Sequence, residues 1–148
     1  MNRTPTQTIG PFFSHALPYK DGPYAVAPGT PDGFWLRGRV LDGAGEPVGD
    51  ALVETWQSDP DGFGRCPTDE DGAWAIFTVR PPDGRHIAMS VFARGLLDRV
   101  VTRVYFTEPA LDGLTEAELA TLVARPGEDG YLFDIRLQGE HETVFFSV

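Results

Sequence analysis

The sequence predicts an all-β fold, a β-sandwich with one short inserted helix. Asp-Gly dipeptides, which favour tight chain reversals, occur eight times in 148 residues. Seventeen glycines and thirteen prolines accompany a hydrophobic content of 41%, which favours many short elements joined by turns over disorder. Seven runs with strand character lie between the turns, at residues 35–41, 51–58, 73–79, 86–93, 100–106, 131–137 and 143–147. Seven short strands are typical of a sandwich.

Two segments give more detailed expectations. In the run 131–137, apolar residues alternate with others, so one face is expected to line the core. That face carries Tyr131, Phe133, Ile135 and Leu137. The sequence TEAE, starting at Thr115, offers a helix capping box, and apolar residues follow it at helical spacing as far as residue 123. We therefore expect a helix of two to three turns here, inserted between strands.

The length of 148 residues suits a single domain, residues 1–148. Residues 1–33 are rich in proline and show little periodicity, so they are expected to form an extended N-terminal arm, with the β-sandwich in residues 34–148. An arm of this length usually serves an interface or a site.

Composition excludes several classes of partner. Lys and Arg total 12 and Asp and Glu total 22, giving a net charge of -10, which repels nucleic acids and anionic membranes. We therefore expect no nucleic-acid and no membrane partner. The single Cys66 cannot form an internal disulfide, and the polar start of the chain does not resemble a secretory signal. These features favour a cytoplasmic protein.

The histidines are candidate metal ligands. His15, His86 and His141 lie far apart, and none has a partner at a recognised ligand spacing. A strand-borne metal site would place a second ligand two residues after His86, where Ala88 stands instead. The strand face of His86 also carries Ser90 and Arg94, so it is either a binding surface or an ordinary half-solvated face.

Other charged motifs have simpler interpretations. The acidic segments DPDG (59–62) and DEDG (69–72) lack the rest of a calcium loop and are expected to be hairpin turns. Arg94, Arg99 and Arg103 lie close together in an otherwise acidic chain, where they could attract a carboxylate. The alternative is that they are surface charges paired with Asp98 and Glu108.

Six stretches of the chain together indicate a family. They are TPTQTIGPFF (4–13), LRGRVLDGAGEPVGDALVETWQSD (36–59), FGR (63–65), HIAMSVFARG (86–95), TRVYF (102–106) and YLFDIRLQGEHETVFFSV (131–148). These stretches closely resemble the alpha chains of the protocatechuate 3,4-dioxygenases, in the intradiol ring-cleavage dioxygenase family. The resemblance covers nearly the whole chain, and it implies a β-sandwich of the intradiol dioxygenase type.

The resemblance implies a subunit of a ring-cleaving oxidoreductase. In that family, alpha and beta chains assemble, and ferric iron with O₂ opens 3,4-dihydroxybenzoate to 3-carboxy-cis,cis-muconate. The beta chain holds the iron with two tyrosines and a His-x-His pair. Here the matching stretch reads His86-Ile87-Ala88, and no tyrosine lies between residues 56 and 85. The resemblance therefore implies no metal and no catalytic residue in this chain, with Fe(III) in the partner beta chain.

The resemblance also implies a role at the substrate pocket of that partner. Thr8, Gly10, Pro11 and Arg94 match positions by which alpha chains line the pocket for the small aromatic acid. The chain would thus form a hetero-oligomer with the iron-bearing beta subunit. It is shorter than the family's alpha chains after the arm, between residues 57 and 63, and before His86.

Two other hypotheses remain at the sequence level. The chain could be a stand-alone β-sandwich module for binding or scaffolding, without catalysis. It could also be an autonomous metalloenzyme that uses His86 and Tyr105.

Overall fold

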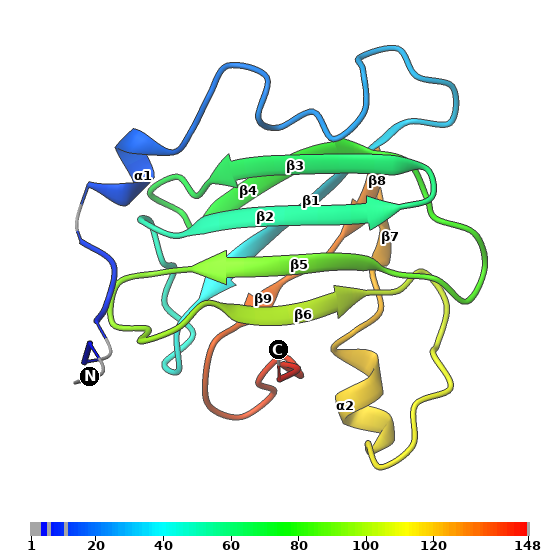
Figure 1. Cartoon of the computed structure of the whole chain (residues 1–148). Coiled ribbons are helices and arrows are strands. Elements are labelled where there is room, and N and C mark those ends of the chain that lie inside the picture. The colour runs from blue at the N-terminus through cyan, green and yellow to red at the C-terminus, as the bar shows by residue number, and fades with distance from the viewer. Residues whose placement is uncertain (1–3, 6, 11, 148) are drawn as a thin grey trace.

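The computed structural model describes residues 4–5, 7–10 and 12–147, and two β-sheets packed face to face dominate it (Figure 1). One sheet has the order β4-β1-β8-β7, with β9 also paired to β1, and the other has the order β3-β2-β5-β6. The all-β sandwich prediction is confirmed. The elements are α1 (Phe13–Ala16), β1 (Phe34–Leu41), β2 (Leu52–Ser58), β3 (Asp61–Pro67), β4 (Ala73–Thr78), β5 (Ile87–Phe92), β6 (Val100–Val104), α2 (Glu116–Ala120), β7 (Arg125–Gly127), β8 (Gly130–Leu132) and β9 (Ile135–Arg136).

The core lies between the two sheets and follows the alternation of the strands. In β5, Ile87, Met89 and Val91 are buried, and the residues between them are half-buried. Leu36 on β1 and Ile76 on β4 are buried apolar residues of the opposite sheet, and they belong to the same core. Because alternate strand residues point to opposite faces, His86 and Arg94 lie on the side of β5 that faces away from the core.

Strand β3 was not predicted, because its glycines have low strand propensity. Those glycines are needed for close packing. A Cβ on Gly64 would lie 2.5 Å from the Ile76 side chain, and a Cβ on Gly62 would lie 2.7 Å from the carbonyl oxygen of Ala25. Asp59 and Pro60 of the segment DPDG form the turn before β3, its other two residues begin β3, and DEDG forms the turn after β3.

The C-terminal strand predictions need correction. The run 131–137 forms two short strands, β8 and β9, which both pair parallel to β1. Its core face is confirmed, since Phe133 and Ile135 are buried and the other two residues pack against the core. Residues 143–147 form no strand. They run beside β6, where the amide of Phe146 donates to the carbonyl of Val101 over 2.8 Å.

The capping box at α2 is confirmed, but the helix ends at Ala120, earlier than predicted. The residues after it pair with Tyr105 instead: the Tyr105 amide donates to Leu122, and the amide of Ala124 donates to Tyr105, both over 2.8 Å. Tertiary pairing thus overrides helical spacing. The helices within the described residues are too short to cross a membrane.

The segment 1–33 also differs from the expectation of an arm without helix. Within it, α1 forms a single turn, and Tyr24 makes an isolated β-bridge to Phe77. Arg65 on β3 fastens this segment to the sandwich, because its guanidinium donates to the carbonyl of Leu17 over 3.0 Å and lies 5.8 Å from the ring of Tyr19. The described part of this segment therefore contains one helical turn and is attached to the sandwich at β3 and β4.

Candidate functional site

The first part of the arm meets the loop that follows β5. The side-chain oxygen of Thr8 accepts a hydrogen bond of 3.0 Å from the amide of Gly95. Gln7 and Ile9 line a hollow of about 240 Å³ together with Leu97 and its neighbours on this loop. Thr8 thus contacts the residue that follows Arg94, although Thr8 and Arg94 are 86 positions apart in the sequence. The structure brings together two of the predicted pocket residues.

Arg94 is exposed, and its guanidinium Nε pairs with the carboxylate of Asp50. Asp50 precedes β2 and restricts the orientation of the arginine. The sequence does not predict this pairing, because nothing in the chain near Asp50 indicates contact with a residue 44 positions away. The expected alternative, pairing with Asp98 or Glu108, is wrong for Arg94. Its neighbour in the cluster, Arg103, lies 4.2 Å from the ring of Phe146 instead.

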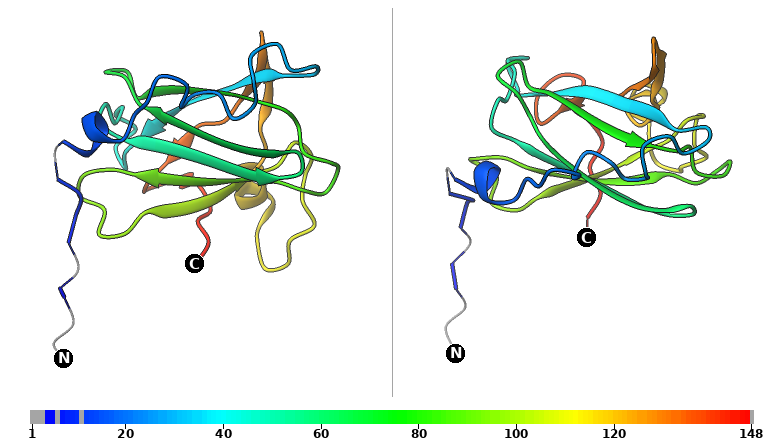
Figure 2. Two further views of the ribbon diagram at one scale, coloured as in Figure 1. Left: turned by 45° about the horizontal axis from the view of Figure 1, so that its top comes forward. Right: turned by 90° about the horizontal axis from the view of Figure 1, so that it is seen from above.

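The other two predicted pocket residues lie on the arm itself. Gly10 is exposed, and a Cβ at this position would meet no atom within 4 Å. Pro11 lies outside the described residues. Among the described residues before position 11, only Ile9 is partly buried. The arm therefore presents most of its surface away from its own chain, and Figure 2 shows it leaving the sandwich at one end.

His86 lies at the opposite end of the same sheet. Its imidazole ring is centred 5.2 Å from the ring of Tyr105. Burial lowers the pKa of His86 below its ordinary value, and the positive charge of Arg103 lowers it further. The imidazole is therefore uncharged at neutral pH. Trp56 and Gln57, from the end of β2, join His86 in lining a cavity of about 310 Å³.

The His86 end and the Arg94 end are far apart. Eight residues of extended chain separate them, which corresponds to roughly 25 Å at about 3.3 Å per residue. Figure 1 shows α1 and the arm on the side of the molecule to which the arrowhead of β5 points, whereas β5 begins at the other side. The arm of this chain therefore does not complete the cavity at its own His86.

The His86 end does not fit a ferric centre. A non-haem iron site needs about three protein ligands or more, and the residues that line the cavity at His86 include one histidine and no tyrosine, cysteine, aspartate or glutamate. Ala88 occupies the position two residues after His86.

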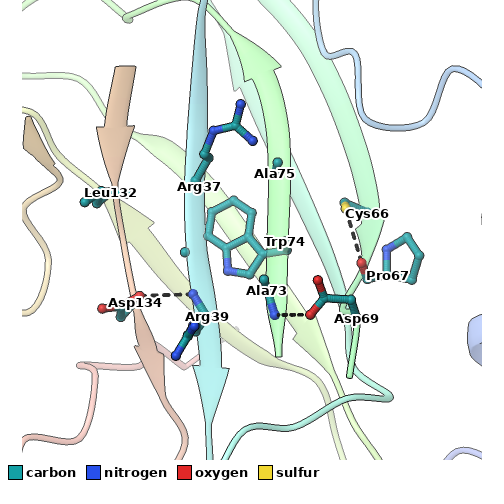
Figure 3. A pocket seen from close by; sticks show the side chains of 11 residues that line it. Arg37, Arg39, Cys66, Pro67, Asp69, Ala73, Trp74, Ala75, Leu132 and Asp134 are labelled. Carbon is teal, nitrogen blue, oxygen red and sulfur yellow. Dashed lines mark hydrogen bonds between the residues drawn. The ribbon is translucent and has the colours of Figure 1, made fainter. Parts of the chain in front are cut away.

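A further hollow of about 680 Å³ lies over β1 and β4, on the outer face of their sheet (Figure 3). Small side chains, Ala73 and Ala75, make room for it. Its carboxylates serve the fold: Asp134 accepts from the amide of Arg39 over 3.0 Å, and Asp69 accepts from the amide of Ala73 over 2.9 Å. This hollow collects none of the predicted pocket residues.

Comparison with known proteins agrees with the resemblance. A family model described as "Dioxygenase" matches residues 8–84. The protocatechuate 3,4-dioxygenase alpha chain of Pseudomonas putida is 34% identical, with 97% of this chain and 95% of the relative covered. The protocatechuate 3,4-dioxygenase beta chain of Burkholderia cepacia is 33% identical, with 80% of this chain and 71% of that relative covered.

Solved structures share the fold. The dioxygenase domain of a carbohydrate-binding fusion protein from Streptomyces sp. SirexAA-E superposes with a TM-score of 0.61 at 25% identity, covering 93% of this chain and 99% of that domain. The alignment with the Pseudomonas putida chain extends over 191 residues against the 148 of this chain, so that relative carries segments that are absent here. The chain belongs to the intradiol dioxygenase family, and over nearly its whole length it resembles the alpha chains of protocatechuate 3,4-dioxygenase.

Proposed function

We propose that this chain is the iron-free alpha subunit of a protocatechuate 3,4-dioxygenase and completes the substrate pocket of an iron-bearing beta chain. The holoenzyme cleaves 3,4-dihydroxybenzoate with O₂ to 3-carboxy-cis,cis-muconate, and the partner's Fe(III) supplies the oxygen chemistry. The observation that carries the proposal is the separation between the arm with Arg94 and the His86 cavity. Because these lie at opposite ends of one sheet, pocket residues on the arm act on a second chain.

The surface around the arm suits a protein partner. Phe12 is 75% exposed and Leu97 62% exposed, and Leu17 and Tyr19 add further exposed apolar area in the same segment. Large apolar side chains that cluster on a surface usually mark an interaction site. In the complex, these residues are buried against a chain of the same fold. Their exposure in the single subunit follows because that partner is missing.

Arg94 gives this subunit a role in substrate choice. Its guanidinium projects from the exposed loop after β5, and Asp50 holds it in place. Arginine binds a carboxylate through two parallel hydrogen bonds, so it favours 3,4-dihydroxybenzoate over an uncharged catechol. Thr8, Gly10 and Pro11 shape the same wall of the pocket. They orient the ring and exclude water, and the protein's own residues contribute no covalent step.

The remaining assignments follow from this role. Residues 1–148 form one domain with residues 1–33 as its arm. The protein works in the cytoplasm, where an aromatic acid is degraded, and it needs neither nucleic acid nor a membrane. The family segments that are absent here belong to loops around the pocket and the subunit contacts, so assembly is the first property to test.

Assembly is tested by size-exclusion chromatography of the chain alone and after co-expression with a beta chain from the same host. We expect a stable complex of the two chains with ring-cleavage activity. Separate elution of both chains contradicts the proposal and favours the stand-alone module.

The pocket assignment is tested by Arg94→Ala in the reconstituted complex. Loss of one charge-assisted contact is expected to raise KM for 3,4-dihydroxybenzoate by roughly tenfold, with kcat changed much less. Arg80→Ala serves as the matched control, because Arg80 pairs with Asp83 away from the arm. An unchanged KM in Arg94→Ala, with intact assembly, removes Arg94 from the pocket.

A further inference from the structure

Asp50 and Arg94 face each other across two paired strands. Strands β2 and β5 are antiparallel, with Leu52 opposite Phe92. When this register is continued beyond the two strand ends, Asp50 comes opposite Arg94, on the same face of the sheet. The ion pair between the Asp50 carboxylate and Nε of Arg94 is therefore a cross-strand contact that follows from the register of the sheet.

The backbone that carries Asp50 is held on both sides. The hydroxyl of the buried Thr68 donates to the carbonyl of Val48 over 2.7 Å, and the same oxygen accepts from the amide of Ala51 over 2.9 Å. The Asp50 side chain is 33% exposed, whereas the Arg94 side chain is 59% exposed. Asp50 is thus the fixed member of the pair, and it orders the long arginine side chain.

The pair leaves one edge of the guanidinium open. A guanidinium binds a carboxylate through Nε and one terminal nitrogen, or through its two terminal nitrogens. Asp50 occupies Nε of Arg94. The hydrogen bonds and ion pairs among the described residues use neither Nη1 nor Nη2 of Arg94. The edge that carries these two nitrogens therefore remains available for a second carboxylate.

We propose that Asp50 is a positioning residue that determines substrate choice, because it directs the Nη1–Nη2 edge of Arg94 toward the substrate carboxylate. The inference rests on the proposed function, in which Arg94 lines the pocket of the beta chain. Ordering a long side chain costs free energy on binding, and Asp50 removes this cost before the substrate arrives. The Asp50 and substrate carboxylates repel each other, but each lies closer to the guanidinium than to the other carboxylate, so attraction dominates.

The reconstituted complex tests this role through kcat and KM for 3,4-dihydroxybenzoate and through the inhibition constant of catechol. Asp50→Ala is expected to raise KM about fivefold with kcat nearly unchanged, because Arg94 must then be ordered by the substrate. The inhibition constant of catechol should stay the same, since catechol has no carboxylate. Asp50→Asn should restore most of the lost affinity, because its amide oxygen still accepts from Nε.

Two controls separate positioning from a structural role. Asp129→Ala is the matched control, because Asp129 pairs with Arg37 on the other sheet, and it should change neither KM nor kcat. In an Arg94→Ala background, Asp50→Ala should have no further effect on KM, because Asp50 acts only through Arg94. Size-exclusion chromatography follows the assembly of each variant with the beta chain.

Any of four results overturns the inference. KM in Asp50→Ala is unchanged or lowered, which would mean that repulsion exceeds positioning. KM in Asp50→Asn is as high as in Asp50→Ala. Asp50→Ala has the same effect with and without Arg94. Asp50→Ala no longer assembles, which would make Asp50 a contact of the subunit interface. An unchanged KM in Arg94→Ala instead contradicts the pocket assignment itself, so failure of the proposed function is distinguishable from failure of the role of Asp50 alone.

Discussion

Gly38 lies where β1 passes closest to the segment that joins β8 to β9. A Cβ at this position would stand 1.7 Å from the carbonyl oxygen of Phe133. The neighbouring backbone is fixed, since the amide of Phe133 donates to the carbonyl of Arg37 over 2.7 Å. The absence of a side chain at one residue thus allows the C-terminal segment to join the first sheet, which closes the core over Phe133.

Gly38→Ala is therefore expected to lower the free energy of unfolding by roughly 3 kcal/mol. The added Cβ either pushes the backbone of Phe133 away or breaks its pairing with β1. Urea denaturation of the isolated chain measures this. Gly10→Ala is the control, since a Cβ there meets no atom within 4 Å, and a change within about 0.5 kcal/mol is expected. Equal stability of the two variants would contradict the close approach at Gly38.

At the level of elements, helix α2 depends on its cap more than on burial. None of the residues from Glu116 to Ala120 is buried, whereas Thr115 and Glu118 form both hydrogen bonds of a capping box. The backbone and hydroxyl of Thr115 donate to the Glu118 carboxylate over 2.7 and 2.8 Å. These bonds lower the pKa of Glu118, so the ionised carboxylate is the form that the folded helix favours.

Thr115→Ala is expected to destabilise α2 locally by about 1 kcal/mol, seen as weaker protection of the Leu119 amide in hydrogen exchange. Thr107→Ala, in an exposed loop, should have no such effect. The contribution of Glu118 is present above the pKa of an unfolded glutamate and is lost as the pH falls through its lowered folded value. Glu118→Gln should therefore remove the acid-dependent loss of protection, and a loss that persists would assign it to another group.

The elements that could be predicted from sequence are those whose signal is local. The strand predicted at residues 86–93 and the capping box at Thr115 each need only a few neighbouring residues, and both are confirmed. Strand β3 was missed, because Gly62 and Gly64 are explained by atoms of Ala25 and Ile76 that lie outside the strand. The prediction of a longer α2 was wrong because of a contact that is also distant in sequence. Backbone pairing with Tyr105 decides where the helix ends.

At the scale of the whole molecule, the sequence does not predict that the arm and Arg94 lie at one end of the sheet and the His86 cavity at the other. The family resemblance named Thr8 and Arg94, but their approach through Gly95 and the pairing of Arg94 with Asp50 are tertiary contacts. The same holds for the cavity at His86, where residues of β2 meet the start of β5. Sequence could indicate that His86 lacks a second strand-borne ligand. It could not indicate that Gln57 and Arg85 would line a cavity with it.

The chain alone is therefore expected to bind no stoichiometric iron and to show no ring cleavage. A lone half-buried imidazole beside Tyr105 cannot supply the ligand set of a ferric ion. Metal analysis after purification in iron-supplemented medium measures the first property, and absorbance in the visible range detects tyrosinate-bound iron. The co-expressed complex is the control and should carry iron and activity. About one iron per chain in the isolated protein, lost in His86→Ala, would instead establish an autonomous metalloenzyme and remove the need for a beta chain.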